Sequence, residues 1–177
     1  FRSSSSVLVF TSSNGTLSNV QFQSATVTAK YFLAGTNPAL TTLITGGTFF
    51  VQALMSYDSG TFGAVSVQGA FVTCISAGNC DALFTSTSSS ISAALFNIDS
   101  CNIQRIAFAK GSGLDPLRTN SLVITGTTWT LGASSLPIVS LAADLFNTTV
   151  SIVTSNIAGT TENSGLISLQ SAGGYLT

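Results

Sequence analysis

The chain contains no histidine and very few charged residues of either sign. Its 177 residues include 5 Lys and Arg together and 6 Asp and Glu together, so charged residues make up 6% of the chain and the formal net charge is −1. An ordinary soluble domain carries roughly 25%. The absence of histidine excludes Ser-His-Asp and Cys-His catalysis, imidazole metal ligands and a histidine pH switch. Five scattered cations also argue against a nucleic-acid partner, because phosphate binding relies on clustered Lys and Arg.

Long hydrophobic runs are lacking as well. Hydrophobic residues form 45% of the chain and the mean hydropathy is +0.51. No run reaches the roughly 18 apolar residues that a membrane-spanning helix needs. Intrinsic disorder requires low hydrophobicity with high net charge, and this composition has neither. The sequence therefore predicts one domain over residues 1–177, with no membrane span, no metal and no cofactor.

Only three cysteines occur. Cys74 and Cys80 flank a turn-forming Ile-Ser-Ala-Gly-Asn stretch that can bring two Cα atoms within the disulfide range of about 4.4–6.8 Å. The alternative is three free thiols acting as small core residues. Cys101 is left over in either case. Asn14-Gly-Thr and Asn147-Thr-Thr match the N-glycosylation pattern and, with the candidate disulfide, favour an extracellular or cell-surface location.

A short unit recurs along the chain: an apolar residue, four residues suited to a turn, and a second apolar residue. The steps between successive first members are 22, 23, 31, 26 and 21 residues. The second of the four turn residues is small in every copy, as a tight turn requires. Apolar or small residues two positions outside the unit give the period of a strand with one buried face. The six copies are Phe22–Val27, Ile44–Phe49, Val67–Val72, Ile98–Ile103, Ile124–Trp129 and Leu145–Val150.

Repeats of this length that contain strands and turns predict an all-β fold. We expect a right-handed parallel β-helix, a solenoid of about six or more coils with its core over about residues 20–155, in which each coil covers the apolar face of the next. Arg105 interrupts the inward alternation, which resumes at Ile106 as it does after a β-bulge. The alternative is a β-sandwich or jelly roll, which also has many short strands. A sandwich does not require a small residue at one place in every unit.

Three of the units carry a family resemblance. Leu43-Ile-Thr-Gly-Gly-Thr-Phe-Phe50, Val65-Ser-Val-Gln-Gly-Ala-Phe-Val72 and Leu122-Val-Ile-Thr-Gly-Thr-Thr-Trp129 resemble coils of the pectin-lyase-like right-handed β-helix superfamily. That superfamily includes polysaccharide lyases and hydrolases, phage tailspikes and surface adhesins. The resemblance covers about residues 20 to 155. It implies a β-helix with an extracellular or surface role, and no active-site residue is carried over from it.

The outward positions around the second apolar residue form the candidate binding surface. With the coils in register, these positions give two rows of short, mostly hydroxyl-bearing side chains on one flat face. Such rows resemble the Thr ladders of ice-binding solenoids, although Thr is also a common solvent-facing strand residue. The rungs are Thr26 with Thr28, Thr48 with Phe50, Phe71 with Thr73, Asn102 with Gln104, Thr128 with Thr130, and Thr149 with Ser151.

No constellation for catalysis is present. The acidic residues are spread mostly one to a coil or loop, and none is paired with another as glycoside hydrolysis requires. We therefore expect a non-enzymatic extracellular or surface structural protein: a rod, adhesin segment or fibre module that self-associates or belongs to a larger assembly. The second hypothesis is a carbohydrate-active or glycan-binding, tailspike-like module. The third is an ice-binding solenoid that uses the Thr ladder.

Overall fold

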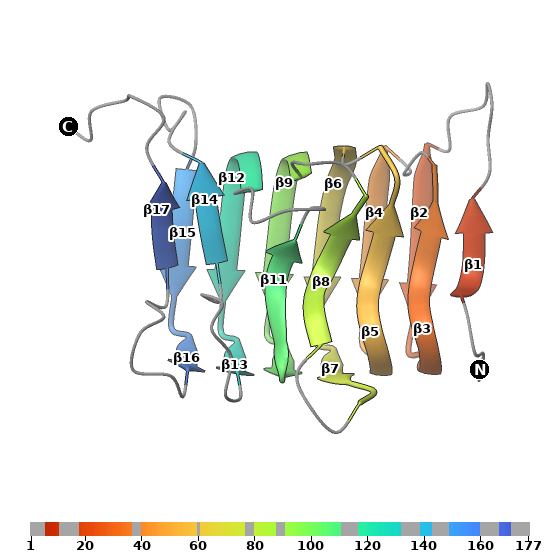
Figure 1. The fold of residues 1–177 in the computed structure, drawn as a ribbon. Helices are drawn as coiled ribbons and strands as arrows, with labels where there is room; N and C mark the ends of the chain where they lie inside the picture. Colours follow the sequence, from red (N-terminus) through yellow and green to blue (C-terminus); the bar gives the residue numbers. More distant parts are fainter. Residues whose placement is uncertain are drawn as a thin grey trace.

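The computed structural model is an all-β solenoid of parallel strands arranged in two sheets (Figure 1). It describes residues 6–10, 18–36, 40–59, 61–76, 80–87, 91–110, 117–131, 139–142, 149–159 and 167–170. The first sheet contains β1 (Ser6–Phe10), β3 (Thr26–Gly35), β5 (Thr48–Tyr57), β7 (Phe71–Cys74), β8 (Cys80–Ser86), β10 (Asn102–Gln104), β11 (Ile106–Lys110), β13 (Thr128–Leu131) and β16 (Asn156–Gly159). The second contains β2 (Asn19–Gln23), β4 (Thr41–Thr45), β6 (Thr61–Gln68), β9 (Ile91–Asp99), β12 (Leu117–Thr125), β14 (Val139–Ala142), β15 (Thr149–Val153) and β17 (Ile167–Gln170).

The recurring unit stacks in register, as the sequence predicted. Its first apolar residues pair from coil to coil in one sheet, and its second apolar residues pair in the other. This parallel pairing confirms the solenoid and excludes the sandwich, whose sheets are antiparallel. The first column is Phe22, Ile44, Val67, Ile98, Ile124 and Ile152, and the second is Val27, Phe49, Val72, Ile103, Trp129 and Ile157.

The sixth unit lies later in the chain than the sequence predicted. Ile124 pairs with Ile152 and Trp129 with Ile157, so the sixth copy is Ile152–Ile157 and not Leu145–Val150. Both segments have apolar residues at their two ends and three polar residues before the second end, and only pairing with the coil below distinguishes them. Six copies of the unit are therefore stacked in the part of the chain that the structure describes. The chain beyond β12 runs through 132–138 and 143–148, which lie outside the described residues.

The second turn residue of every unit has a left-handed backbone. The φ angles are 50° at Ser24, 65° at Gly46, 62° at Gly69, 53° at Ser100, 57° at Gly126 and 46° at Thr154. The backbone N–H of this residue donates to a carbonyl of the next coil, for example from Ser24 to Thr45 and from Gly69 to Asp99, both at 2.8 Å. Five of these residues are Gly or Ser, because a left-handed backbone disfavours bulky side chains, and the sixth unit has the β-branched Thr154. The repeated small residue thus marks the corner between the sheets.

The residue after this corner points inward and is also small. Cys101 and Thr127 occupy this position in adjacent coils, and both are buried. The Cys101 thiol can donate to the carbonyl oxygens of Asp99, at 3.2 Å, and Val67, at 3.4 Å. The backbone N–H of Cys101 donates to the Thr127 hydroxyl. Desolvation by burial raises the pKa of Cys101. Cys101 is therefore a small polar core residue.

A cluster of aromatic rings fills the middle of the solenoid. Phe62, Phe84, Phe96, Phe108 and Trp129 are all at most 2% exposed. Ring centroids of neighbours in this cluster lie 4.6 to 6.0 Å apart. The indole N–H of Trp129 donates to the Ile106 carbonyl at 2.9 Å, which satisfies its only polar group. The cluster joins the third, fourth and fifth coils.

Tyr57 provides the first testable prediction. Its side chain is 0% exposed and, among the described residues, its hydroxyl is the buried side-chain polar atom without a hydrogen-bond partner. Desolvation raises the pKa of Tyr57 to about 12. Because a buried unpaired hydroxyl costs free energy, we expect Tyr57→Phe to raise the free energy of unfolding by about 1 kcal/mol in urea titrations.

The pH dependence of stability provides an independent measurement of the same group. Above a pH of about 10 the unfolded state loses the Tyr57 proton while the folded state keeps it until about 12. The folded state then binds more protons, so this residue's contribution lowers stability as pH rises through that interval. Tyr57→Phe should flatten this decline. A loss of stability in the variant at neutral pH would contradict the unpaired hydroxyl.

Candidate functional site

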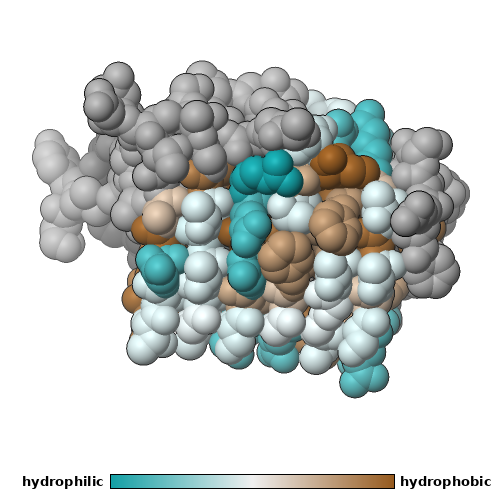
Figure 2. Space-filling view, turned by 90° about the horizontal axis from the view of Figure 1, so that it is seen from below, coloured by the Kyte–Doolittle hydropathy of each residue, from teal (hydrophilic) through white to brown (hydrophobic). Residues whose placement is uncertain are grey.

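The flat face predicted from the Thr pattern exists on the first sheet. Backbone pairing aligns its outward residues in two rows across the coils. Figure 2 views the molecule from the side of β7, β13 and β16. The surface is mainly pale, which marks residues of intermediate hydropathy, with some teal hydrophilic and brown hydrophobic patches. The rows are Thr26, Thr48, Phe71, Asn102, Thr128 and Asn156, and Thr28, Phe50, Thr73, Gln104, Thr130 and Ala158.

The last rung of the predicted rows is wrong. Thr149 pairs with Ser121 and Ser151 pairs with Val123, so both lie on the second sheet. Asn156 and Ala158 take their place. The error follows from the sixth unit, which lies seven residues later in the chain than predicted. Thr149 and Ser151 therefore lie on β15, before the corner, and not on β16, after it.

The Thr rows are interrupted in the middle. Phe50 is 38% exposed and its ring centroid lies 6.4 Å from that of Phe71. Thr73, expected at the surface, is only 4% exposed. Its hydroxyl accepts a hydrogen bond from the Arg105 guanidinium at 3.4 Å. The face therefore presents Thr at both sides of an aromatic pair, with no continuous hydroxyl ladder.

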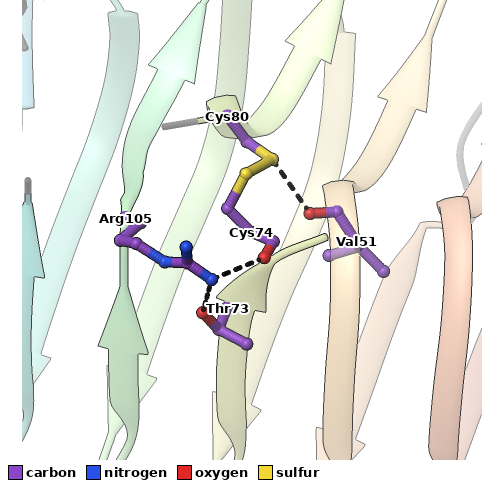
Figure 3. The surroundings of a disulfide bond; sticks show 5 residues. All are labelled: Val51, Thr73, Cys74, Cys80 and Arg105. Atoms are coloured by element: carbon purple, nitrogen blue, oxygen red, sulfur yellow. Dashed lines mark hydrogen bonds between the residues drawn. A yellow bond between two sulfur atoms is a disulfide. The ribbon is translucent and has the colours of Figure 1, made fainter. Parts of the chain in front are cut away.

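The third coil departs from regular stacking beside this face. Val51 pairs with Cys74 and Met55 with Phe84, so the sequence has nine residues between these paired positions in the third coil and three in the coil below. A disulfide between Cys74 and Cys80, with Cα atoms 5.3 Å apart, closes the start of this excursion (Figure 3). The Cys80 sulfur lies 3.2 Å from the Val51 carbonyl oxygen of the coil below. The disulfide ties the longer segment to the stack.

Arg105 supports the same region from the coil above. Its guanidinium Nη2 donates to the Cys74 carbonyl at 3.0 Å (Figure 3). The backbone carbonyl of Arg105 accepts the N–H of Cys80 at 2.9 Å. Its backbone is left-handed, with a φ of 58°, and separates β10 from β11. The alternation of inward and outward side chains is therefore broken by Arg105 alone, which lies opposite the longer segment of the third coil.

A surface hollow of about 270 Å³ lies beside the disulfide, because Ser76 and Cys80 are among its lining residues. Its polar lining comes from three coils, since β3, β5 and β8 lie side by side in the first sheet. Gln52 is exposed, while Tyr31, Ser56 and Thr85 are half-buried. The hollow is lined by Tyr31, Gln52, Ser56, Ser76, Thr85 and Thr87, among others.

Charged groups lie beside the hollow and do not line it. The Lys30 Nζ stands 5.1 Å from the centroid of the Tyr31 ring. Asp58 accepts a hydrogen bond from the Thr87 hydroxyl through its carbonyl at 3.3 Å. Within the described ranges no group of three or more His, Cys, Asp or Glu residues is placed to hold a metal ion.

No family model, curated protein or solved structure matches this chain.

The remaining sequence predictions have simple outcomes. Both sequon residues, Asn14 and Asn147, lie outside the described residues. In the part of the chain that the structure covers, no helix has the length and apolar character to cross a membrane. The hollow was not predicted. The signals for it were the longest repeat step, from Val67 to Ile98, and the cysteine pair within that step.

Proposed function

We propose that this protein is a non-enzymatic extracellular or cell-surface structural protein, a β-solenoid rod, adhesin or fibre module that self-associates or forms part of a larger assembly. The observation that carries the proposal is that described strands at each end of the stack are paired with another described strand on one side only. Among the described strands, β2 pairs only with β4, β15 only with β12 and β16 only with β13. Unpaired strand edges of a solenoid need a cap or a partner strand.

The composition of the surface supports the same role. The flat face is mainly Thr, Asn and Gln, and charged residues are few in the whole chain. Close packing of such a face against a neighbour removes few ions from water, so the desolvation cost is small. The Cys74–Cys80 disulfide supports an extracellular location, because disulfides persist mainly in oxidising compartments.

The stacked corner supports the finer resemblance to the pectin-lyase-like superfamily. Within it, the surface and adhesin-like members suit a chain without histidine and without paired carboxylates. A glycan-binding, tailspike-like role is the second candidate, and the hollow beside the disulfide loop favours it. Ice binding has less support, because Phe50, Phe71 and Asn102 interrupt the Thr rows.

Sedimentation of the native protein and of an edge variant tests the assembly. The Val153 carbonyl accepts from Gly126 of the coil below, so by strand alternation the N–H of Val150 points to the open side of β15. Val150→Pro removes that donor, and Val150→Thr keeps it. We expect the native protein and the Thr variant to sediment as species larger than 18.1 kDa and the Pro variant to shift towards the monomer.

Circular dichroism on the same samples separates this effect from unfolding. We expect the Pro variant to keep its β-sheet spectrum, because Val150 is 38% exposed. A change in sedimentation without a change in the spectrum then reports loss of assembly. A native protein that stays a stable monomer at all concentrations would contradict the proposal.

A further inference from the structure

We propose that the hollow beside the disulfide loop is a binding site for a neutral oligosaccharide, with one sugar ring in the hollow and the adjoining ring over Ile75 and Phe50. The proposal rests on the second candidate function, glycan binding, whose ligand class it specifies, and it does not depend on the structural role. The proposal rests on the shape of the hollow, the chemistry of its lining and the exposed apolar residues next to it.

The hollow exists because the third coil leaves the regular stack. A regular parallel solenoid has flat sides, since each residue lies above its counterpart in the coil below. Between the Val51–Cys74 and Met55–Phe84 pairs this correspondence fails, and a recess opens beside the longer segment. The disulfide and the Arg105 hydrogen bonds fix the start of that segment. The site is therefore preformed, which lowers the ordering cost of binding.

The size of the hollow suits a small ligand. Its volume of about 270 Å³ is slightly below the ~300–1,000 Å³ of pockets that enclose drug-sized molecules. One sugar ring with its hydroxyls fits such a space, and the next ring of a chain must lie outside it.

The lining matches the hydrogen-bonding groups of a neutral sugar. Each sugar hydroxyl is both donor and acceptor. The Gln52 amide supplies both functions, and so do the hydroxyls of Ser56 and Thr85. These side chains are exposed or half-buried, so a ligand meets them at the surface. Tyr31 adds an aromatic ring, whose apolar faces pack against the C–H groups of a sugar while its hydroxyl stays polar.

The absence of charge in the described lining excludes ionic ligands as the preferred class. A phosphate, sulfate or uronate in the hollow would lose hydration without gaining an ionic partner from the lining residues. Lys30 is not a lining residue, and its ammonium group lies 5.1 Å from the centroid of the Tyr31 ring. The described lining residues include no carboxylate, and the Asp58 carboxylate lies 3.5 Å from the Thr87 hydroxyl at the edge of the lining, so the proposal is for sugar binding alone.

The exposed apolar residues continue the site along the coils. The N–H of Ile75 donates to the Val51 carbonyl, so Ile75 lies alongside Gln52. Phe50 is the next outward residue on β5, and its ring contacts Phe71. Ile75 is 41% exposed and Phe50 is 38% exposed. Exposed aromatic and aliphatic side chains next to a polar recess provide a platform for a second ring.

Titration of the ¹⁵N-labelled protein with defined tetrasaccharides tests the site. The probes are cellotetraose, maltotetraose and chitotetraose, with tetragalacturonate as the acidic comparison. We expect at least one neutral probe to shift the amide signals of Gln52, Ser56 and Thr85 with millimolar affinity. Tyr31→Ala and Gln52→Ala should each weaken that binding by about tenfold, the effect of losing a central contact.

Gln21→Ala is the matched control. Gln21 is an exposed glutamine on β2 of the other sheet, so its removal should leave the affinity unchanged. Three results would each overturn the proposal: no shift with any neutral probe at 20 mM, full affinity in both hollow variants, or binding of tetragalacturonate as tight as that of the neutral probes. The Val150→Pro variant should bind with native affinity, which separates failure of this site from failure of the assembly.

Discussion

Replacing Phe96 by alanine is expected to lower the free energy of unfolding by about 3–5 kcal/mol, the typical cost of removing a buried aromatic ring. Phe96 is 0% exposed, and its ring centroid lies 4.6 Å from that of Phe84 and 5.0 Å from that of Phe108. These rings belong to three different strands, so the cavity opens where adjacent coils meet. Urea unfolding followed by circular dichroism measures the loss.

Phe50→Ala is the control for this substitution. It removes the same side chain from the same kind of strand, but Phe50 is 38% exposed and, among the described residues, its ring pairs with that of Phe71 only. We expect a loss below about 1 kcal/mol, since little area is returned to water. Equal losses in the two variants would contradict the assignment of Phe96 to the core and of Phe50 to the surface.

Replacing Gly47 by alanine is expected to destabilise the protein by about 3 kcal/mol, through backbone strain combined with a clash. The φ angle of Gly47 is 99°, a conformation that L residues rarely adopt. A Cβ atom there would lie 2.5 Å from the Ala25 carbonyl oxygen. That oxygen accepts the N–H of Thr48, so it cannot move without breaking a bond between coils.

Gly69→Ala separates the clash from the strain. Gly69 also has a left-handed backbone, with a φ of 62°, but a Cβ atom there would meet no atom within 4 Å. Ser24 and Ser100 hold the same corner position with similar φ angles, so a side chain is tolerated. We expect a cost of about 1 kcal/mol, that of a left-handed L residue alone. If chemical denaturation shows Gly47→Ala to be as mild as Gly69→Ala, the close approach at Ala25 is wrong.

Much of the fold was predictable because the repeating unit carries its own local signals. Alternating apolar residues specify strands with one buried face, and a small residue at a constant place specifies the corner. These signals identified five of the six units correctly, together with the columns that begin at Phe22 and Val27. The rows of outward residues on the flat face followed from the same alternation.

Local sequence signals did not determine the position of the sixth unit. Leu145–Val150 and Ile152–Ile157 both match the pattern, and nothing within either segment decides between them. The pairing of Ile152 with Ile124 decides it, and that pairing depends on the path of the whole preceding coil. Thr149 and Ser151 were assigned to the wrong sheet for this reason.

The candidate site could be predicted only in part from the sequence. The cysteine pair and the long repeat step indicated an insertion in the third coil. They did not indicate that Tyr31, Gln52 and Thr85, from three successive coils, line one hollow. Arg105 was predicted as an irregularity, but its hydrogen bond to Cys74 depends on the coil below.

The sequence by itself determined the class of fold, the corner of each coil and the chemistry available at the surface, because alternation, small residues and the scarcity of charge act over a few neighbouring positions. The tertiary structure decided the register of the last coil, the buried position of Thr73 and the position of the hollow. Each of these depends on residues about 20 to 30 positions apart in the chain, which parallel stacking brings to within one strand spacing of each other.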